Sequence, residues 1–184
     1  MKQMKKLLQK LKVMSKSTYE VGDEYEHYIA KDFGGKVVRG SGRVLFRPGD
    51  CKTNEWLIQC KFTGKDTYRL TLGDLIKSEK ESYEAKKDFL FCVGIQKHKN
   101  TFVIERVTKV PNDELVLKVK KSFKLEISML YLESFIYVEY ANGYIYRIGE
   151  RDWYFDNIMQ WSVTLVCDTE KVYLGHPFQS IRQP

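Results

Sequence analysis

The sequence predicts an α/β protein with a mixed β-sheet core flanked by helices and a β-rich C-terminal addition. A helical stripe of apolar residues precedes several apolar strands, a second amphipathic helix lies between two of those strands, and tyrosine-rich hairpin patterns follow. The 184 residues suit one domain with an appendage, and 43% apolar residues suffice for a core. We expect a basic helix at 1–16, a core domain at 17–134 and a β-rich extension at 135–184.

The charge of the chain is basic and uneven. The whole chain carries +7, whereas residues 133–184 hold four Lys/Arg and seven Asp/Glu, a net of −3, which leaves +10 on residues 1–132. An anionic partner would therefore dock on the N-terminal two-thirds of the chain.

Four cysteines without a CxxC pair and only three histidines exclude a zinc spacing and favour a reducing, cytoplasmic setting. No apolar run is long enough to cross a membrane, and the start lacks the apolar region of a signal peptide.

Two helices are predicted at the N-terminal end. Residues 1–16 hold six lysines and no acid, which fits a basic amphipathic helix that touches phosphates or a membrane surface, or a solvated helix with one packed face. A second helix begins at Ser17, because Ser17 and Glu20 form a capping box. Apolar residues recur at helical spacing as far as Phe33, and Gly34-Gly35 ends the helix. A short strand, KVVRG, and an arginine-containing loop, SGRVLFRPGD, follow.

Residues 49–63, GDCKTNEWLIQCKFT, predict a β-hairpin with polar side chains inside it. With Asn54-Glu55 as a two-residue turn, Asp50 falls directly opposite Gln59. Side chains alternate along a strand, so Gln59 and Lys61 share one face. An acid, an amide and an amine therefore converge at one place.

The remaining elements complete the predicted core. Residues 71–87 fit an amphipathic helix, DFLFCVGIQ and TFVIERV fit buried strands, and KLEISMLYLESF fits a short closing helix. IYVEYANGYIYRI has an Asn-Gly turn and predicts a hairpin, and WSVTLVCDTEKVYLG predicts another. This C-terminal part fits an element for dimerisation or for shaping a substrate site.

The converging polar groups suit phosphodiester hydrolysis, which needs divalent cations held by hard oxygen ligands and a group that orients water. Asp50 and Gln59 offer such oxygens, and the backbone carbonyl of Cys60 lies between them and Lys61. The lysine would hold the attacking water or the scissile phosphate. An isolated Asp and Lys near a hairpin would otherwise indicate a surface ion pair.

The order of these segments resembles that of the PD-(D/E)XK nuclease superfamily. The segments are GDEYEHYIAKDFGGKVVRGSGR, PGD, WLIQCKFT and FLFCVGI, and they are most similar to Holliday junction resolvases of the archaeal type and their phage relatives. The resemblance covers roughly residues 17–110. It implies a restriction-endonuclease-like sheet, Mg²⁺- or Mn²⁺-dependent cleavage of DNA by an intracellular enzyme, and a homodimer that acts on four-way junctions.

The resemblance also assigns residues. Glu26 matches the acid of the first helix, and it is preferred over Glu24 because it lies four residues after Gly22, as in resolvases. Pro48-Gly49-Asp50 matches the PD element with one extra residue, and Gln59-Cys60-Lys61 matches (D/E)-x-K. The implied metal ligands are Asp50, Gln59, Glu26 and the Cys60 carbonyl. The resemblance also implies that Lys61 activates water and that Ser41 of Gly40-Ser41-Gly42 assists at the phosphate. The candidate DNA contacts are Arg39, Arg43, Arg47 and Lys77, although such side chains are often simply solvated.

Gln59 departs from the family pattern, because glutamine keeps a carbonyl oxygen but removes a negative charge. Three explanations are open. Another acid, such as Glu24, Glu26, Glu79 or Glu81, supplies the charge; the chain is a catalytically impaired DNA-binding relative; or an engineered change replaced a native glutamate. The alternative enzyme is a restriction-like or nicking endonuclease on duplex DNA.

Overall fold

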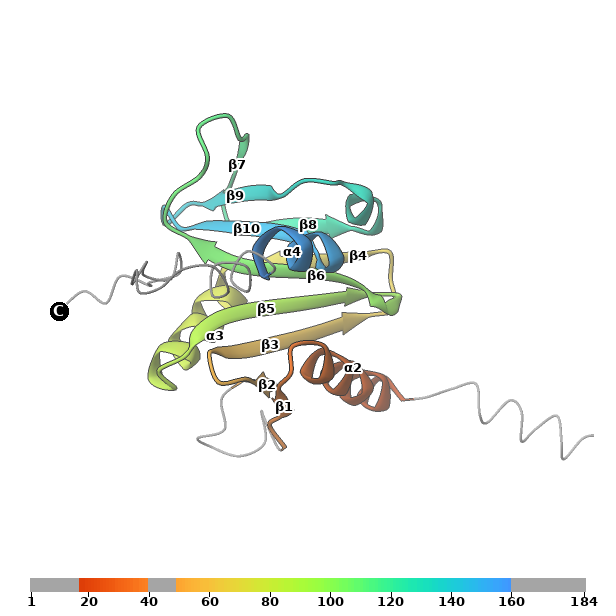
Figure 1. The fold of residues 1–184 in the computed structure, drawn as a ribbon. Helices are drawn as coiled ribbons and strands as arrows, with labels where there is room; N and C mark the ends of the chain where they lie inside the picture. Colours follow the sequence, from red (N-terminus) through yellow and green to blue (C-terminus); the bar gives the residue numbers. More distant parts are fainter. Residues whose placement is uncertain (1–16, 40–48, 160–184) are drawn as a thin grey trace, which may run out of the picture.

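The computed structural model describes residues 17–39 and 49–159. The expected helix at 1–16, residues 41–48 of the expected loop at 41–50, and the expected hairpin at 161–175 lie outside these ranges. Within them, the chain forms one large mixed sheet with helices on both faces (Figure 1). The expected α/β class is confirmed at this level. None of the described helices has the length and hydropathy that a bilayer crossing requires.

The helix predicted from Ser17 is present, and both hydrogen bonds of its capping box form. The helix predicted at 71–87 is also present and begins at an N-cap threonine, Thr71. The described elements are α2 (Thr18–Asp32), β1 (Lys36–Val37), β2 (Cys51–Lys52), β3 (Trp56–Thr63), β4 (Thr67–Thr71), α3 (Leu72–Glu84), β5 (Asp88–Ile95), β6 (Lys97–Val107), β7 (Val116–Val119), β8 (Ser122–Glu126), the 3₁₀ turn η1 (Ile127–Tyr131), β9 (Ile136–Tyr140), β10 (Ile145–Glu150), α4 (Arg151–Tyr154) and the π-helical turn η2 (Phe155–Met159).

The large sheet has the described strand order β1-β2-β3-β5-β6-β10-β9-β7. Its pairs are antiparallel except β3 with β5 and β7 with β9. A parallel pair needs a crossover, and the segment from β3 to β5 supplies it by carrying α3. Among the described strands, β4 and β8 pair with each other alone and form a separate two-stranded ribbon.

The Asn-Gly hairpin predicted near residue 142 is confirmed. Gly143 has a φ of +80°, which an L-residue with a side chain rarely adopts, and Tyr140 donates its backbone N–H to Tyr144 at 2.9 Å. β10 also pairs with β6 along its whole length. This hairpin is therefore part of the large sheet, and the domain boundary at residue 135 stays a prediction.

The prediction of a helix in KLEISMLYLESF is wrong for the first part of this segment. Residues up to Glu126 belong to β8, and only a 3₁₀ turn, η1, follows. The reason is packing: Leu125 is fully buried and pairs opposite Tyr68 of β4, so burial and strand pairing outweigh the helical preference of the segment. Sequence patterns had not indicated β4 at all.

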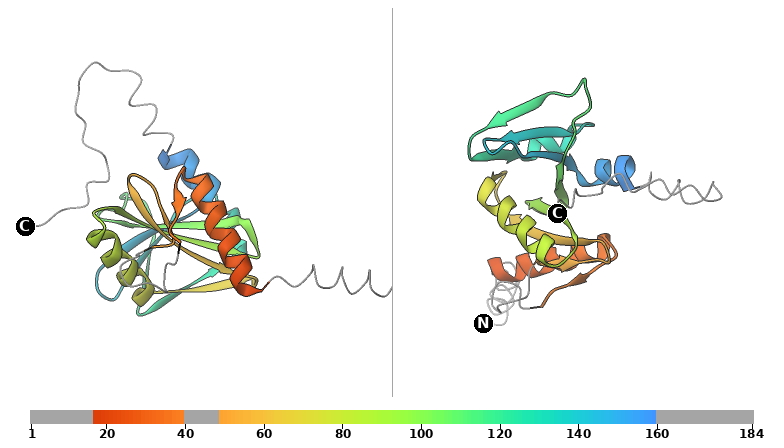
Figure 2. Two further views of the ribbon diagram at one scale, coloured as in Figure 1. Left: turned by 90° about the horizontal axis from the view of Figure 1, so that it is seen from below. Right: turned by 90° about the vertical axis from the view of Figure 1, so that its left-hand side faces the viewer.

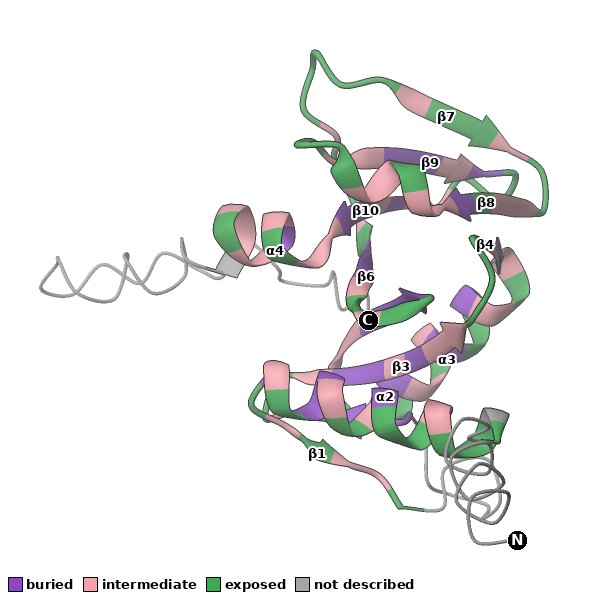
Figure 3. Cartoon of the chain, turned by 90° about the vertical axis from the view of Figure 1, so that its right-hand side faces the viewer, coloured by how far each residue is buried: buried purple, intermediate pink, exposed green. Residues whose placement is uncertain are grey.

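Each face of the sheet has its own core. α3 and the β4–β8 ribbon cover one face, and α2 and α4 cover the other (Figure 2). Figure 3 shows buried residues along the sheet strands and exposed residues on the outer sides of the helices. Alternate residues of β5 pack in different cores. Phe91, Val93 and Ile95 belong to the core on the α3 side, whereas Leu90 and Cys92 belong to the core on the α2 side.

A buried ion pair joins strands β6 and β10. Glu105 and Arg147 are direct cross-strand partners, and Arg147 Nε donates to Glu105 Oε1 at 2.5 Å. The hydroxyl of Tyr154 in α4 donates to the other carboxylate oxygen at 3.0 Å. Burial raises the pKa of Glu105, while Arg147 and the hydroxyl lower it. The network attaches α4 to the centre of the sheet.

Candidate functional site

The predicted hairpin forms in the predicted register. Cys51 pairs with Ile58, and Thr53 donates its N–H to the carbonyl of Trp56 at 2.9 Å, which closes the turn at Asn54-Glu55. The same register sets Asp50 opposite Gln59. The geometry on which the candidate site depends is therefore present.

Asp50 and Gln59 contact each other directly. The amide Nε2 of Gln59 donates to Asp50 Oδ2, and the backbone N–H of Cys60 donates to the same oxygen at 2.8 Å. Asp50 is only 9% exposed, so these donors stabilise a carboxylate that is largely removed from water. Because Gln59 uses its NH₂ group here, its carbonyl oxygen is the atom available to a ligand.

The glycine before Asp50 fixes the entry of the chain into the site. Gly49 has a φ of +71°, and a Cβ atom at this position would lie 2.6 Å from Leu57 Cγ. Both the backbone conformation and the close approach to the Leu57 side chain disfavour other residues here. The hairpin itself therefore favours the glycine before Asp50.

Lys61 lies two residues beyond Gln59 on β3, and the strand alternation gives both side chains the same face. Their partners on β5 are Phe91 and Val93, which belong to the core on the α3 side. Lys61 is half-buried, which suits a lysine whose apolar stem packs against its neighbours while its charged end stays near water.

Glu26 approaches the hairpin from α2. The thiol of Cys51 donates to the backbone carbonyl of Glu26 at 3.1 Å, which links the helix to β2. Burial raises the pKa of the Glu26 carboxyl to about 7; the charges of Asp50 and Asp23 add to this, while His27 and Lys61 oppose it. The carboxyl therefore lies within electrostatic reach of both hairpin charges. Glu24, its competitor on the same helix, is exposed.

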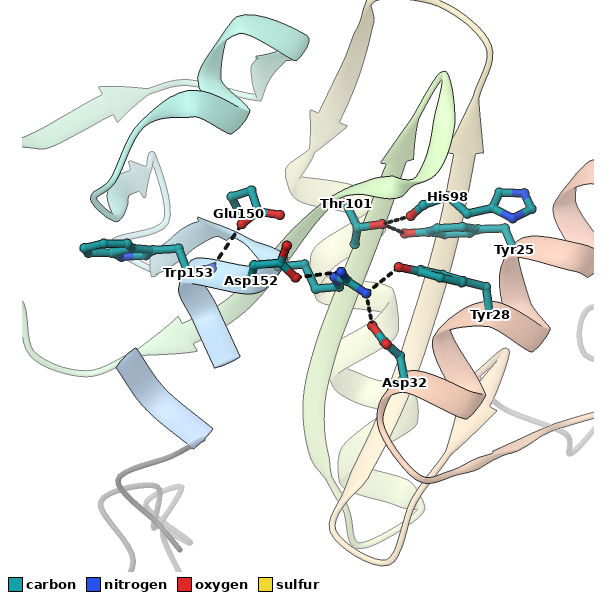
Figure 4. Close-up of polar contacts among 9 residues, drawn as sticks. Tyr25, Tyr28, Asp32, His98, Thr101, Glu150, Asp152 and Trp153 are labelled. Atoms are coloured by element: carbon teal, nitrogen blue, oxygen red, sulfur yellow. Dashed lines mark hydrogen bonds and ion pairs between the residues drawn. The ribbon is translucent and has the colours of Figure 1, made fainter. Parts of the chain in front are cut away.

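Polar contacts hold α2 against the sheet and α4 (Figure 4). The Tyr25 hydroxyl donates to Thr101 Oγ1 at 3.1 Å, since the threonine hydroxyl itself donates to the His98 carbonyl at 2.7 Å. Arg151 of α4 donates to Asp32 Oδ2 at 2.7 Å and to the hydroxyl of Tyr28. Glu26 thus lies on a helix fixed at several points, none of which the sequence patterns had indicated.

Of the four acids named for the missing charge, the two on α3, Glu79 and Glu81, lie in different places. Glu81 lines a narrow pocket beside Gln59, together with Gly49 and Leu57 of the hairpin, and accepts a hydrogen bond from the Gly49 N–H at 3.3 Å. Glu79 instead forms an ion pair with Arg106 at 3.3 Å. The structure therefore brings Glu81, and not Glu79, to Gln59.

The predicted DNA contacts are only partly described. Lys77 is exposed on α3, with its ammonium 3.9 Å from Glu81, and Arg39 is exposed after β1. Ser41, with its neighbours Gly40 and Gly42, lies outside the described residues, as do Arg43, Arg47 and Pro48.

The candidate ligand atoms are carboxylate and carbonyl oxygens, which are the type of ligand that a hard divalent cation prefers. Among residues 17–39 and 49–159, no group of three His, Cys, Asp or Glu side chains is already arranged around a common point. Burial is the main cause of the raised pKa of Glu26, and the charge of Asp50 raises it further, so a cation bound near both carboxyl groups would relieve their repulsion. The donor chemistry therefore fits Mg²⁺ or Mn²⁺, with Gln59 as a neutral member.

Comparisons with protein-family models, with curated proteins and with solved structures each found no match to this chain.

Glu26 gives the stability of the protein a pH dependence. Its folded-state pKa is about 7 against an ordinary 4.5, so between these values the folded chain binds more protons than the unfolded chain. The free energy of unfolding therefore falls as the pH rises through this window. We expect Glu26→Gln to raise it at pH 8 by about 1 to 2 kcal/mol, less than full linkage gives because the carboxyl is half exposed, and to bring no such gain at pH 4.

Urea denaturation at both pH values, without divalent cations, measures this difference. Glu24→Gln is the matched control, an exposed change on the same helix that should shift the free energy of unfolding by less than about 0.5 kcal/mol. An effect of Glu26→Gln that is equal at pH 4 and pH 8 would contradict the prediction.

Proposed function

We propose that this protein is a divalent-metal-dependent DNA endonuclease with a PD-(D/E)XK-like core, a structure-selective enzyme of the Holliday junction resolvase type. The observation that carries the proposal is the direct contact of Asp50 with Gln59 on paired strands, with Lys61 two residues further along the same face. Glu26 adds a carboxyl from a helix that the Cys51 thiol links to the hairpin.

Asp50, the Gln59 carbonyl, Glu26 and the Cys60 backbone carbonyl would hold Mg²⁺ or Mn²⁺, which would polarise the scissile phosphate and acidify a water molecule. Lys61 orients the attacking water or a phosphate oxygen by donating hydrogen bonds from its ammonium group. The hydrogen bonds from Gln59 and Cys60 hold the Asp50 carboxylate in place. Ser41 assists at the phosphate, as the family resemblance implies.

The substrate is held by charge rather than by sequence. Arg39, Arg43, Arg47 and Lys77 contact DNA phosphates, and the +7 net charge supports a polyanionic partner. Symmetric cleavage of two strands needs two sites, so the enzyme acts as a homodimer. Comparing cleavage of a four-way junction with cleavage of linear duplex tests the selectivity, since equal cutting of both would favour a restriction-like or nicking endonuclease.

The missing charge at position 59 is supplied from α3 by Glu81, which lies beside Gln59. Gln59→Glu restores a carboxylate at the hairpin and should lower the half-saturating Mg²⁺ concentration by about tenfold, with a rise in junction cleavage at limiting Mg²⁺. Glu81→Gln in the natural chain should have the opposite effect. Both are read from Mg²⁺ titrations of junction cleavage and from the Mg²⁺-induced shift in Tm.

Glu79→Gln is the matched control, because Glu79 lies on the same helix but pairs with Arg106. It should leave the Mg²⁺ dependence unchanged. If Glu79→Gln and Glu81→Gln change it equally, Glu81 has no special role. If the Gln59→Glu variant binds DNA but does not cut it, restoring the charge is not enough for cleavage. That result would favour the second candidate, a catalytically impaired DNA-binding relative.

A further inference from the structure

The β4–β8 ribbon carries an exposed basic surface that the proposed active site does not use. Its inner residues, Leu70 and Leu125, are fully buried against the large sheet. On its outer side, Arg69 pairs directly opposite Lys124, and both are exposed. Lys120 and Lys121, also exposed, precede β8; we call Arg69, Lys120, Lys121 and Lys124 the basic ribbon surface.

This arrangement costs stability unless an anion covers it. Like charges directly opposite each other on paired strands destabilise a ribbon. Lys124 has a counter-charge in Glu126, at 2.6 Å, but within the described parts of the chain neither Arg69 nor Lys121 forms an ion pair. Asp74, the nearby acid of α3, accepts a hydrogen bond from the Thr71 hydroxyl at 2.6 Å instead. Two cations are therefore available to an external anion.

Arg69 and Lys121 both line an open groove of about 490 Å³. The carbonyl of Lys121 accepts the backbone N–H of Leu72 at 2.9 Å, which fixes the turn before β8 against the start of α3. The groove is lined by Arg69, Thr71, Leu72, Gly73, Ile76, Lys121 and Ser122. This lining includes no aromatic ring for stacking a base and no acid to repel a phosphate.

The ribbon also lies on the same face of the sheet as the candidate site. Leu70 and Leu125 pack in the same core as Phe91 and Val93, the partners of Gln59 and Lys61 on β5. Figure 2 shows the ribbon and α3 together on this face. A DNA duplex bound at the hairpin could therefore extend along α3 toward the ribbon.

We propose that the basic ribbon surface binds the sugar-phosphate backbone of a duplex arm of branched DNA, independently of sequence. The inference rests on the proposed function, and it assigns a second DNA-contacting surface outside the hairpin and its arginine loop. Arg69 and Lys121 beside an open groove suit the repeated phosphates of a duplex, and the groove lining offers no aromatic ring on which a base could stack.

The test uses the full chain with the variant Arg69→Gln/Lys121→Gln. The control is Lys31→Gln/Lys109→Gln, which removes the same charge from exposed positions outside the groove. Binding of a labelled four-way junction without divalent metal should weaken about tenfold in the ribbon variant. The slope of log affinity against log salt should fall by about 2. Cleavage at saturating DNA should keep its rate, since no hairpin residue is changed.

The outcomes separate the two proposals. If the natural protein binds and cuts no DNA, the proposed function itself fails. If it does bind and the ribbon variant matches the control, only the ribbon proposal is overturned. A changed sedimentation coefficient with unchanged DNA affinity would also overturn it, by assigning the surface to subunit contact. Lys121→Gln alone should give about half the change in salt slope, which keeps the test valid if the double variant is unstable.

Discussion

Lys61→Met should lower the turnover of junction cleavage by about 10²- to 10⁴-fold, the range for loss of a group that positions or transfers a proton. The methionine keeps the apolar stem that packs in the half-buried position and removes only the ammonium group. The affinity for the junction without divalent metal should change only a few-fold. Single-turnover cleavage at saturating protein measures the chemical step directly.

Lys65→Met is the matched control for this change. Lys65 is exposed just after β3, so it removes the same charge from the same strand end without touching the site. Cleavage by Lys65→Met should stay close to that of the natural protein. If Lys61→Met cleaves as well as this control, the catalytic lysine lies elsewhere and the hairpin is not the active site.

Arg147→Met should destabilise the protein by about 3 to 5 kcal/mol, because it leaves the Glu105 carboxylate buried without its cation. Glu105 is only 5% exposed and accepts hydrogen bonds from Arg147 and from the Tyr154 hydroxyl. The variant keeps the second of these donors and loses the first. Burial already raises the pKa of Glu105, and loss of the arginine should raise it further. The loss of stability should therefore be smaller at acid pH, where the carboxyl becomes neutral.

The double variant Glu105→Gln/Arg147→Met is the control, because it removes both charges together. It should recover a large part of the lost stability, since the cost lies in the uncompensated charge more than in the missing pair. Urea unfolding of the single and double variants at pH 5 and pH 8 measures both effects. A loss below about 1 kcal/mol for Arg147→Met would show that water reaches Glu105.

The local features of the fold could be predicted because neighbouring residues determine them. The capping box at Ser17 and Glu20, the turn at Asn54-Glu55 and the Asn-Gly hairpin all form as expected. Asp50 faces Gln59 because a two-residue turn fixes the register of the whole hairpin. The core of the candidate site was therefore predictable from one short segment.

Other features depended on contacts distant in sequence. β4 and β8 form because Leu70 and Leu125 complete a core with strands far away in the chain, and no local period in the sequence indicates this. The C-terminal hairpin joins the large sheet because β10 finds its partner in β6. Strand partners are chosen by mutual burial, which a pattern within one segment does not encode.

Neighbouring residues are enough to specify the helix from Ser17, the hairpin register, and the acid, amide and lysine that the register brings together. Which helical acid accompanies them depends instead on packing between segments that are distant in sequence. Glu79 and Glu81 are two residues apart and equally suitable by type, but they project in different directions from α3, so one reaches Arg106 and the other reaches the hairpin. That choice depends on how the helix is rotated against the sheet, and packing of its apolar side chains sets this rotation.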